Sequence, residues 1–137
     1  MVAAVCGWHV HHAAAAAEIE RRLERGERMT IAAHAVAETY AVLTRLPPPH
    51  RLSSADAWAL VRTNFVDQAA LAALDGPAHV AVLAQLADAG VGGGRTYDAL
   101  IAACAEASEA KALLTFNRRH FDPAPRDVTI VEPTESD

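Results

Sequence analysis

The chain has 137 residues, of which 52% are hydrophobic and 21% charged, a balance typical of one globular domain that needs no disulfides. Its net charge of −5 has the wrong sign for a protein that coats nucleic acid by electrostatic attraction alone. No apolar stretch approaches the roughly 18 residues that span a membrane, and the N-terminus lacks the basic start of a secretory signal. We therefore expect a cytoplasmic protein with no membrane contact and a single domain over residues 1–137.

The residue pattern alternates between helical and strand character along the chain. Apolar residues recur three and four apart in the expected helices, Gly26 and Gly90 follow two of them as stops, and Ser53 with Asp56 is typical of a helix cap. In chain order the predicted elements are a helix over residues 9–25, a strand over 29–33, helices over 35–46 and 53–62, a strand over 65–74, helices over 76–89 and 97–107, and strands over 113–116 and 128–131. This alternation favours an α/β fold with a parallel sheet, whose sites gather beyond the carboxyl ends of its strands.

Composition also predicts how some segments pack. The helix over residues 97–107 is apolar nearly all round, which predicts burial on most sides. Cys6 and Cys104 lack metal-type spacing, so we expect two reduced thiols packed as small apolar groups. Trp8 and Trp58 are expected to be core or partner-facing rings, with base stacking as the lesser alternative.

Two acidic side chains are candidates for holding a divalent metal ion. Asp98 lies in the first turn of the apolar helix, where the positive end of the helix dipole stabilises a carboxylate. Glu38 is the only acid between residues 32 and 45, one turn into a helix that follows a strand. Either could instead be an ordinary helix-end or surface charge. If they converge, ligation by oxygen alone suits Mg²⁺ or Mn²⁺ better than zinc.

A polar cluster follows the strand over residues 113–116. Asn117 could orient a metal-bound water, and Arg118, Arg119 or His120 could face the phosphate of a substrate. The alternative is a solvated turn with a charged face.

Three segments taken together resemble PIN-domain toxins of the VapC type. They are Ala-Val-Ala-Glu at residues 35–38, Tyr-Asp-Ala-Leu-Ile-Ala-Ala-Cys-Ala at 97–105 and Leu-Thr-Phe-Asn-Arg-Arg-His-Phe at 114–121, in the family's order. On this resemblance Glu38 and Asp98 match the second and third metal-site acids, and Asn117 falls where the family has a fourth acid or an asparagine. The second and third segments are fairly specific, whereas the first alone is weak.

The resemblance implies a PIN-like three-layer fold with a parallel sheet flanked by helices. It also implies an activity, that of a Mg²⁺-dependent endoribonuclease cutting structured RNA as the toxin of a type II toxin–antitoxin system. Its implied partners are RNA, a cognate VapB-type antitoxin and a second copy in a homodimer. The catalytic residues would be Glu38, Asp98 and Asn117, the metal ligands Glu38 and Asp98, and the RNA contacts Arg118 and Arg119.

The start of the chain departs from the family pattern. Residues 1–6 resemble the part that follows the family's first catalytic aspartate, so the first strand and that acid are expected to lie upstream of Met1. One alternative is a catalytically inert, truncated PIN-like module that binds antitoxin or RNA. A second is an unrelated α/β domain, such as a receiver-like one, in which Asp98 is only a helix-end charge. Residues 132–137 are expected to form an acidic tail.

Overall fold

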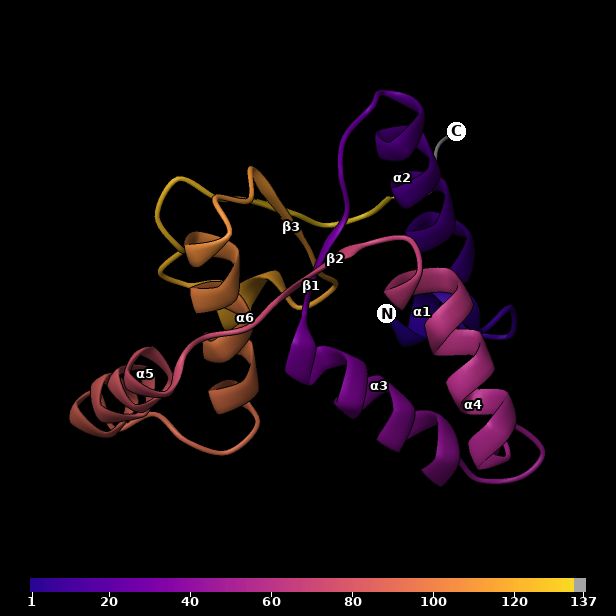
Figure 1. Cartoon of the computed structure of the whole chain (residues 1–137), viewed down its shortest axis with the longest axis horizontal. Coiled ribbons are helices and arrows are strands. Elements are labelled where there is room, and N and C mark those ends of the chain that lie inside the picture. Colours follow the sequence, from indigo (N-terminus) through magenta and orange to yellow (C-terminus); the bar gives the residue numbers. More distant parts are fainter. Residues whose placement is uncertain (135–137) are drawn as a thin grey trace. The chain divides into compact units, whose positions relative to one another are not determined.

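The structure, a computed structural model, describes residues 1–134 and alternates helices with short strands (Figure 1). Its elements are α1 (Val2–Val5), α2 (His12–Glu24), β1 (Thr30–Ala32), α3 (Ala33–Arg45), α4 (Ser54–Val61), the π-helical turn η1 (Arg62–Val66), β2 (Ala70–Ala72), α5 (Gly76–Asp88), α6 (Arg95–Ala107), β3 (Ala112–Leu114), the 3₁₀ turn η2 (Arg118–Phe121) and β4 (Thr129–Val131). The predicted α/β class is confirmed.

Two predicted elements begin three or more residues later in the structure than expected, each for a local reason. The helix expected from residue 9 begins only at His12, because the residues before it turn: the His9 N–H donates to the Cys6 carbonyl at 2.8 Å, and the His12 N–H to the His9 carbonyl at 2.8 Å. The strand expected over residues 65–74 covers only Ala70–Ala72. Phe65 instead continues the preceding helix in η1, where its ring is buried. Its apolar character therefore marks the core rather than a strand.

The predicted helix ends are confirmed at their caps. The Ser53 Oγ accepts a hydrogen bond from the Asp56 N–H at 3.1 Å and donates one to the Asp56 carboxylate at 2.7 Å, so the start of α4 is capped. Gly26 and Gly90 follow α2 and α5 with φ angles of 80° and 65°. Those left-handed conformations suit glycine and end each helix where the sequence placed its stop.

The chain divides into two compact units. The first comprises Met1–Leu71 and the segment from Pro133, and the second comprises Ala72–Glu132. Each has its own buried cluster and is described by itself. The expectation of a single domain stays a prediction.

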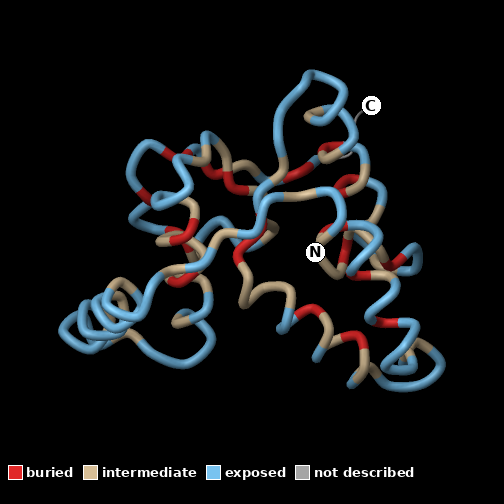
Figure 2. Tube along the Cα trace, in the orientation of Figure 1, coloured by how far each residue is buried: buried red, intermediate tan, exposed pale blue. Residues whose placement is uncertain are grey.

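The core of the first unit lies where α1, α3, α4 and η1 meet. Buried positions recur along α3 and α4 (Figure 2), at Thr39 and Leu43 in the first helix and Ala57 and Val61 in the second. The buried residues of the cluster are Cys6, Ile31, Leu43, Ala57, Val61 and Phe65. In the same unit α2 buries a charge, because Glu18 is 4% exposed and pairs with both Arg21 and Arg22.

The second unit is organised around two parallel strands. β3 pairs with β4 in parallel, with Leu113 opposite Ile130. Its buried cluster is Leu113, Phe121, Val128 and Ile130, against which Ile101, Ala102 and Ala105 of α6 pack. β1 and β2 form a separate two-stranded sheet, so the described strands make two short ladders rather than one continuous sheet.

Some packing expectations are wrong and others are confirmed. In α6 only Leu100 and Cys104 are buried, so the predicted burial on most sides does not occur. Trp8 and Trp58 are 48% and 47% exposed, so neither is a core ring, and the partner-facing alternative stays a prediction. Both cysteines are buried free thiols, as predicted, and burial raises the pKa of each. No helix within residues 1–134 is long and apolar enough to cross a membrane.

The fully buried side chain of Leu43 gives a test of the first unit's core. We expect Leu43→Ala to lower the free energy of unfolding by about 2–5 kcal/mol, because it removes buried apolar surface and leaves a cavity. The matched control is Leu23→Ala in α2, where a 43% exposed leucine should cost less than about 1 kcal/mol. Urea unfolding of both variants gives the comparison, and equal losses would contradict the assigned core.

Candidate active site

Asp98 is held at the start of α6 by the glycine turn before it. Gly93 adopts a φ angle of 64°, which reverses the chain, and its carbonyl accepts the Thr96 N–H at 3.1 Å in the first turn of the helix. Asp98 follows within that first turn, as predicted, and its side chain is 22% exposed. Its Oδ2 lies 3.0 Å from the Nδ1 of His120, while its Oδ1 makes no hydrogen bond within the described residues.

The turn after β3 carries the polar cluster predicted from the sequence. The Asn117 N–H donates to the Thr115 Oγ1 at 3.0 Å, and the His120 N–H donates to the Asn117 carbonyl at 2.8 Å. Phe121 then enters the buried cluster of the second unit. These contacts fix η2 against α6 and turn His120 toward Asp98.

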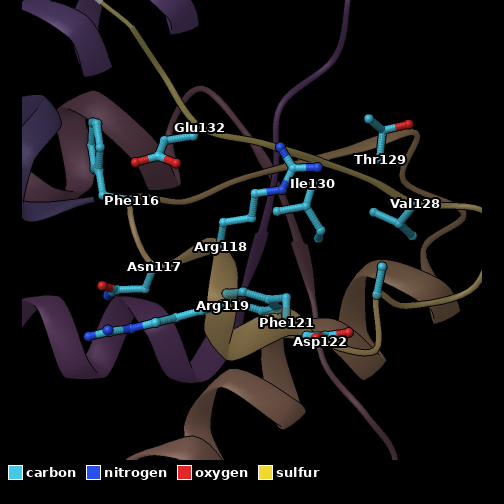
Figure 3. Close-up of a pocket in the computed structure, with 11 residues that line it drawn as sticks. Phe116, Asn117, Arg118, Arg119, Phe121, Asp122, Val128, Thr129, Ile130 and Glu132 are labelled. Carbon is cyan, nitrogen blue, oxygen red and sulfur yellow. The ribbon is translucent and has the colours of Figure 1, made fainter.

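The same turn lines an open pocket of about 800 Å³ in the second unit (Figure 3). Figure 3 shows that Arg118 and Arg119 leave the turn in different directions, Arg118 toward Ile130 and Arg119 toward the side on which Asn117 lies. Neither arginine makes a hydrogen bond or ion pair within the described residues, and both are exposed. Phe121, Val128 and Ile130 supply apolar wall. The carboxylates Asp122 and Glu132 also line the pocket, which therefore combines two arginines without a partner in the described part of the chain, two acids and apolar surface.

Glu38 lies in the first unit, on the exposed side of α3. The next residue, Thr39, is buried, and its Oγ1 donates to the Ala35 carbonyl at 2.8 Å, which orients this turn of the helix. Burial lowers the pKa of the Met1 amino group, and the nearby charges of Glu38 and Cys6 raise it. Glu38 is thus within electrostatic range of α1.

The structure brings together the predicted site residues of the second unit. Asp98, Asn117, Arg118 and Arg119 all lie there, on α6 or around η2. Their convergence with Glu38 stays a prediction. Across residues 1–134 no three histidine, cysteine or acidic side chains form a group that could hold a metal ion.

The sequence does not predict the contact between His120 and Asp98, and it indicates for His120 only a contact with phosphate. The order of the elements along the chain could have predicted this contact. A strand that follows a helix and packs against it runs back along that helix, so the end of β3 returns to the first turn of α6. Residues just beyond such a strand are therefore expected near the start of the helix.

Comparisons with known proteins agree with this α/β arrangement. The family model of the PIN domain matches residues 1–126. The chain is 41% identical to the ribonuclease VapC40 of two Mycobacterium tuberculosis strains over 117 residues, which is 82% of this chain and 78% of the relative. It is 36% identical to the ribonuclease VapC27 of the same species over 109 residues, 80% of this chain and 66% of the relative. A comparison with solved structures found no significant match.

The chain therefore belongs to the PIN-domain family, among its VapC-type toxins. The predicted resemblance is confirmed, and with it the PIN-like α/β fold.

Proposed function

We propose that the chain is a Mg²⁺-dependent endoribonuclease that cuts structured RNA, the toxin of a type II toxin–antitoxin pair. One observation carries the proposal: a half-buried carboxylate, Asp98, is held in place beside a turn whose arginines have no partner within residues 1–134. The similarity to two proteins named as ribonucleases supports it. By the same reasoning we infer a homodimer that acts in the cytoplasm and is neutralised when a VapB-type antitoxin covers the site.

The donor chemistry of the candidate residues fits a hard divalent cation. Glu38 and Asp98 are carboxylates, and Oδ1 of Asp98 has no hydrogen-bond partner within the described part of the chain. Oxygen donors of this kind suit Mg²⁺, with Mn²⁺ as the alternative. When bound, such an ion acidifies water and stabilises negative charge on the phosphate.

The other residues have roles in binding and orientation. Arg118 and Arg119 bind the RNA backbone through charge-assisted hydrogen bonds to phosphate oxygens. Asn117 orients the attacking water through its side-chain amide. A net charge of −5 leaves RNA binding to local contacts, and in the pocket these are the exposed Arg118 and Arg119, beside the acids Asp122 and Glu132.

Replacing the carboxylate without changing its shape tests the role of Asp98. We expect Asp98→Asn to reduce cleavage of a structured RNA to background, because an amide binds Mg²⁺ far less well than a carboxylate does. Its cost in folding should be only about 0.3–1 kcal/mol, the usual contribution of a first-turn acid. Cleavage with and without EDTA and a thermal melt give the two measurements.

Asp56→Asn is the matched control for that variant. Asp56 is also a first-turn acid, at the start of α4, so the same substitution should leave cleavage unchanged. Equal cleavage by the two variants would make Asp98 merely structural. RNA binding by the unsubstituted chain without EDTA-sensitive cleavage would instead favour the inert module.

Convergence of the two acids on one metal ion is testable without RNA. We expect Mn²⁺ to broaden the backbone amide NMR signals around Glu38 and Asp98 most strongly and at the same low concentration, because a paramagnetic ion relaxes the nuclei nearest to it most. Signals around Asp56 serve as the internal control. Broadening around Asp98 alone would remove Glu38 from the site.

The arginines of the pocket should contribute to RNA affinity through phosphate. We expect the double variant Arg118→Gln and Arg119→Gln to weaken RNA binding and to flatten its salt dependence, by about 0.7 in log–log slope for each lost contact with a single strand. The control pair is Arg25→Gln and Arg28→Gln, two exposed arginines of the first unit. Binding curves at several salt concentrations measure the slope. An identical slope in both double variants would contradict RNA binding by Arg118 and Arg119 at the pocket.

A further inference from the structure

The contact between His120 and Asp98 joins two elements that are distant in sequence. The Nδ1 of His120 and the Oδ2 of Asp98 are 3.0 Å apart and belong to side chains 34% and 22% exposed. An ionised carboxylate only accepts hydrogen bonds, so in this contact the proton lies on Nδ1. The imidazole therefore donates to one oxygen of Asp98 and leaves the other oxygen available.

The packing of η2 builds this contact into the fold. Phe121, the residue after His120, is 6% exposed in the cluster that includes Ile101, Ala102 and Ala105 of α6. The His120 N–H is bonded to the Asn117 carbonyl at 2.8 Å, which holds the turn closed. The backbone of His120 is thus held near the start of α6 by the buried ring of Phe121, so its position does not depend on its own side chain alone.

A metal-binding carboxylate gains from such a partner. Unrestrained, an aspartate samples several rotamers, and the loss of that freedom opposes metal binding. A hydrogen bond to one oxygen fixes the plane of the carboxylate and aims the lone pairs of the other oxygen in one direction. Partners of this kind typically change metal affinity about 10–100-fold.

We propose that His120 is a positioning residue, which orients Asp98 for a divalent cation by donating Nδ1–H to Oδ2 while Oδ1 faces the ion. The inference rests on the proposed function, because it needs Asp98 to be a metal ligand. It assigns His120 a role different from contact with phosphate. The effect acts through Asp98, so it should change metal affinity and leave the affinity for RNA unchanged.

The test measures Mn²⁺ binding to the folded protein by calorimetry or electron paramagnetic resonance, without RNA. We expect His120→Ala to weaken Mn²⁺ binding about 10–100-fold. His120→Asn should recover most of the affinity, because its amide nitrogen lies close to the position of Nδ1 and can donate the same bond. His120→Gln places its amide nitrogen near the position of Nε2 and should recover less.

His79→Ala is the matched control, an exposed histidine on α5 in the same unit, and it should bind Mn²⁺ normally. The Mg²⁺ concentration that gives half-maximal RNA cleavage should rise in His120→Ala by the same factor, with KM for RNA unchanged at saturating metal. Melting curves check that each variant folds. If the alanine variant is unstable, His120→Asn and His120→Gln provide the comparison, because both stay polar and only the first keeps a donor near the position of Nδ1.

The outcomes separate this inference from the proposed function. Unchanged or tighter Mn²⁺ binding by both His120→Ala and His120→Asn, in a protein that binds Mn²⁺ and cuts RNA, would overturn the positioning role alone. Equal affinities of the asparagine and glutamine variants would also overturn it, because the role requires a donor at Nδ1. An unsubstituted protein that neither binds Mn²⁺ nor cuts RNA would overturn the proposed function and this inference together.

Discussion

Burial of the Phe121 ring is the contact on which the candidate site depends. The ring joins Leu113 of β3 and Ile130 of β4 in one cluster, against which the apolar side of α6 packs. A 3₁₀ turn of four residues has little stability of its own, so η2 keeps its conformation through this burial. The burial of Phe121 therefore determines how the polar side chains of η2 are oriented.

The same burial explains how one short turn serves two different chemical surfaces. His120 faces the start of α6, where it contacts Asp98. The Asn117 carbonyl holds the turn closed by accepting the His120 N–H. Arg118 and Arg119 lie between them and line the pocket, as Asn117 also does. A 3₁₀ turn has three residues per turn, so neighbouring side chains point in different directions. The geometry places a restrained carboxylate and two available cations within one compact unit.

The sequence predicts the helices and their ends better than it predicts contacts between distant residues. Elements with strong local signals, such as the capped start of α4 at Ser53 and the end of α5 before Gly90, were predicted correctly because caps and stops act within a few residues. Phe65 was misassigned, since an apolar residue beyond a helix fits a strand or a continued helix equally well until its packing is known. Asp98 was found from its place in a helix. Its partner His120 was not, because a contact across 22 residues depends on tertiary packing.

The burial pattern of α5 distinguishes this helix from the rest of its unit. No residue of Gly76–Asp88 is buried, and Val80 is 65% exposed. The helix is capped by the Asp75 carboxylate, which accepts the Ala78 N–H at 2.8 Å, so its ends are defined while its sides contribute little to the core. Such a segment opens locally at low free-energy cost and exchanges its amide hydrogens early, whereas β3, β4 and α6 stay closed. Substitutions in α5 should therefore disturb the turn that holds Asp98 less than substitutions in β3, β4 or α6 do.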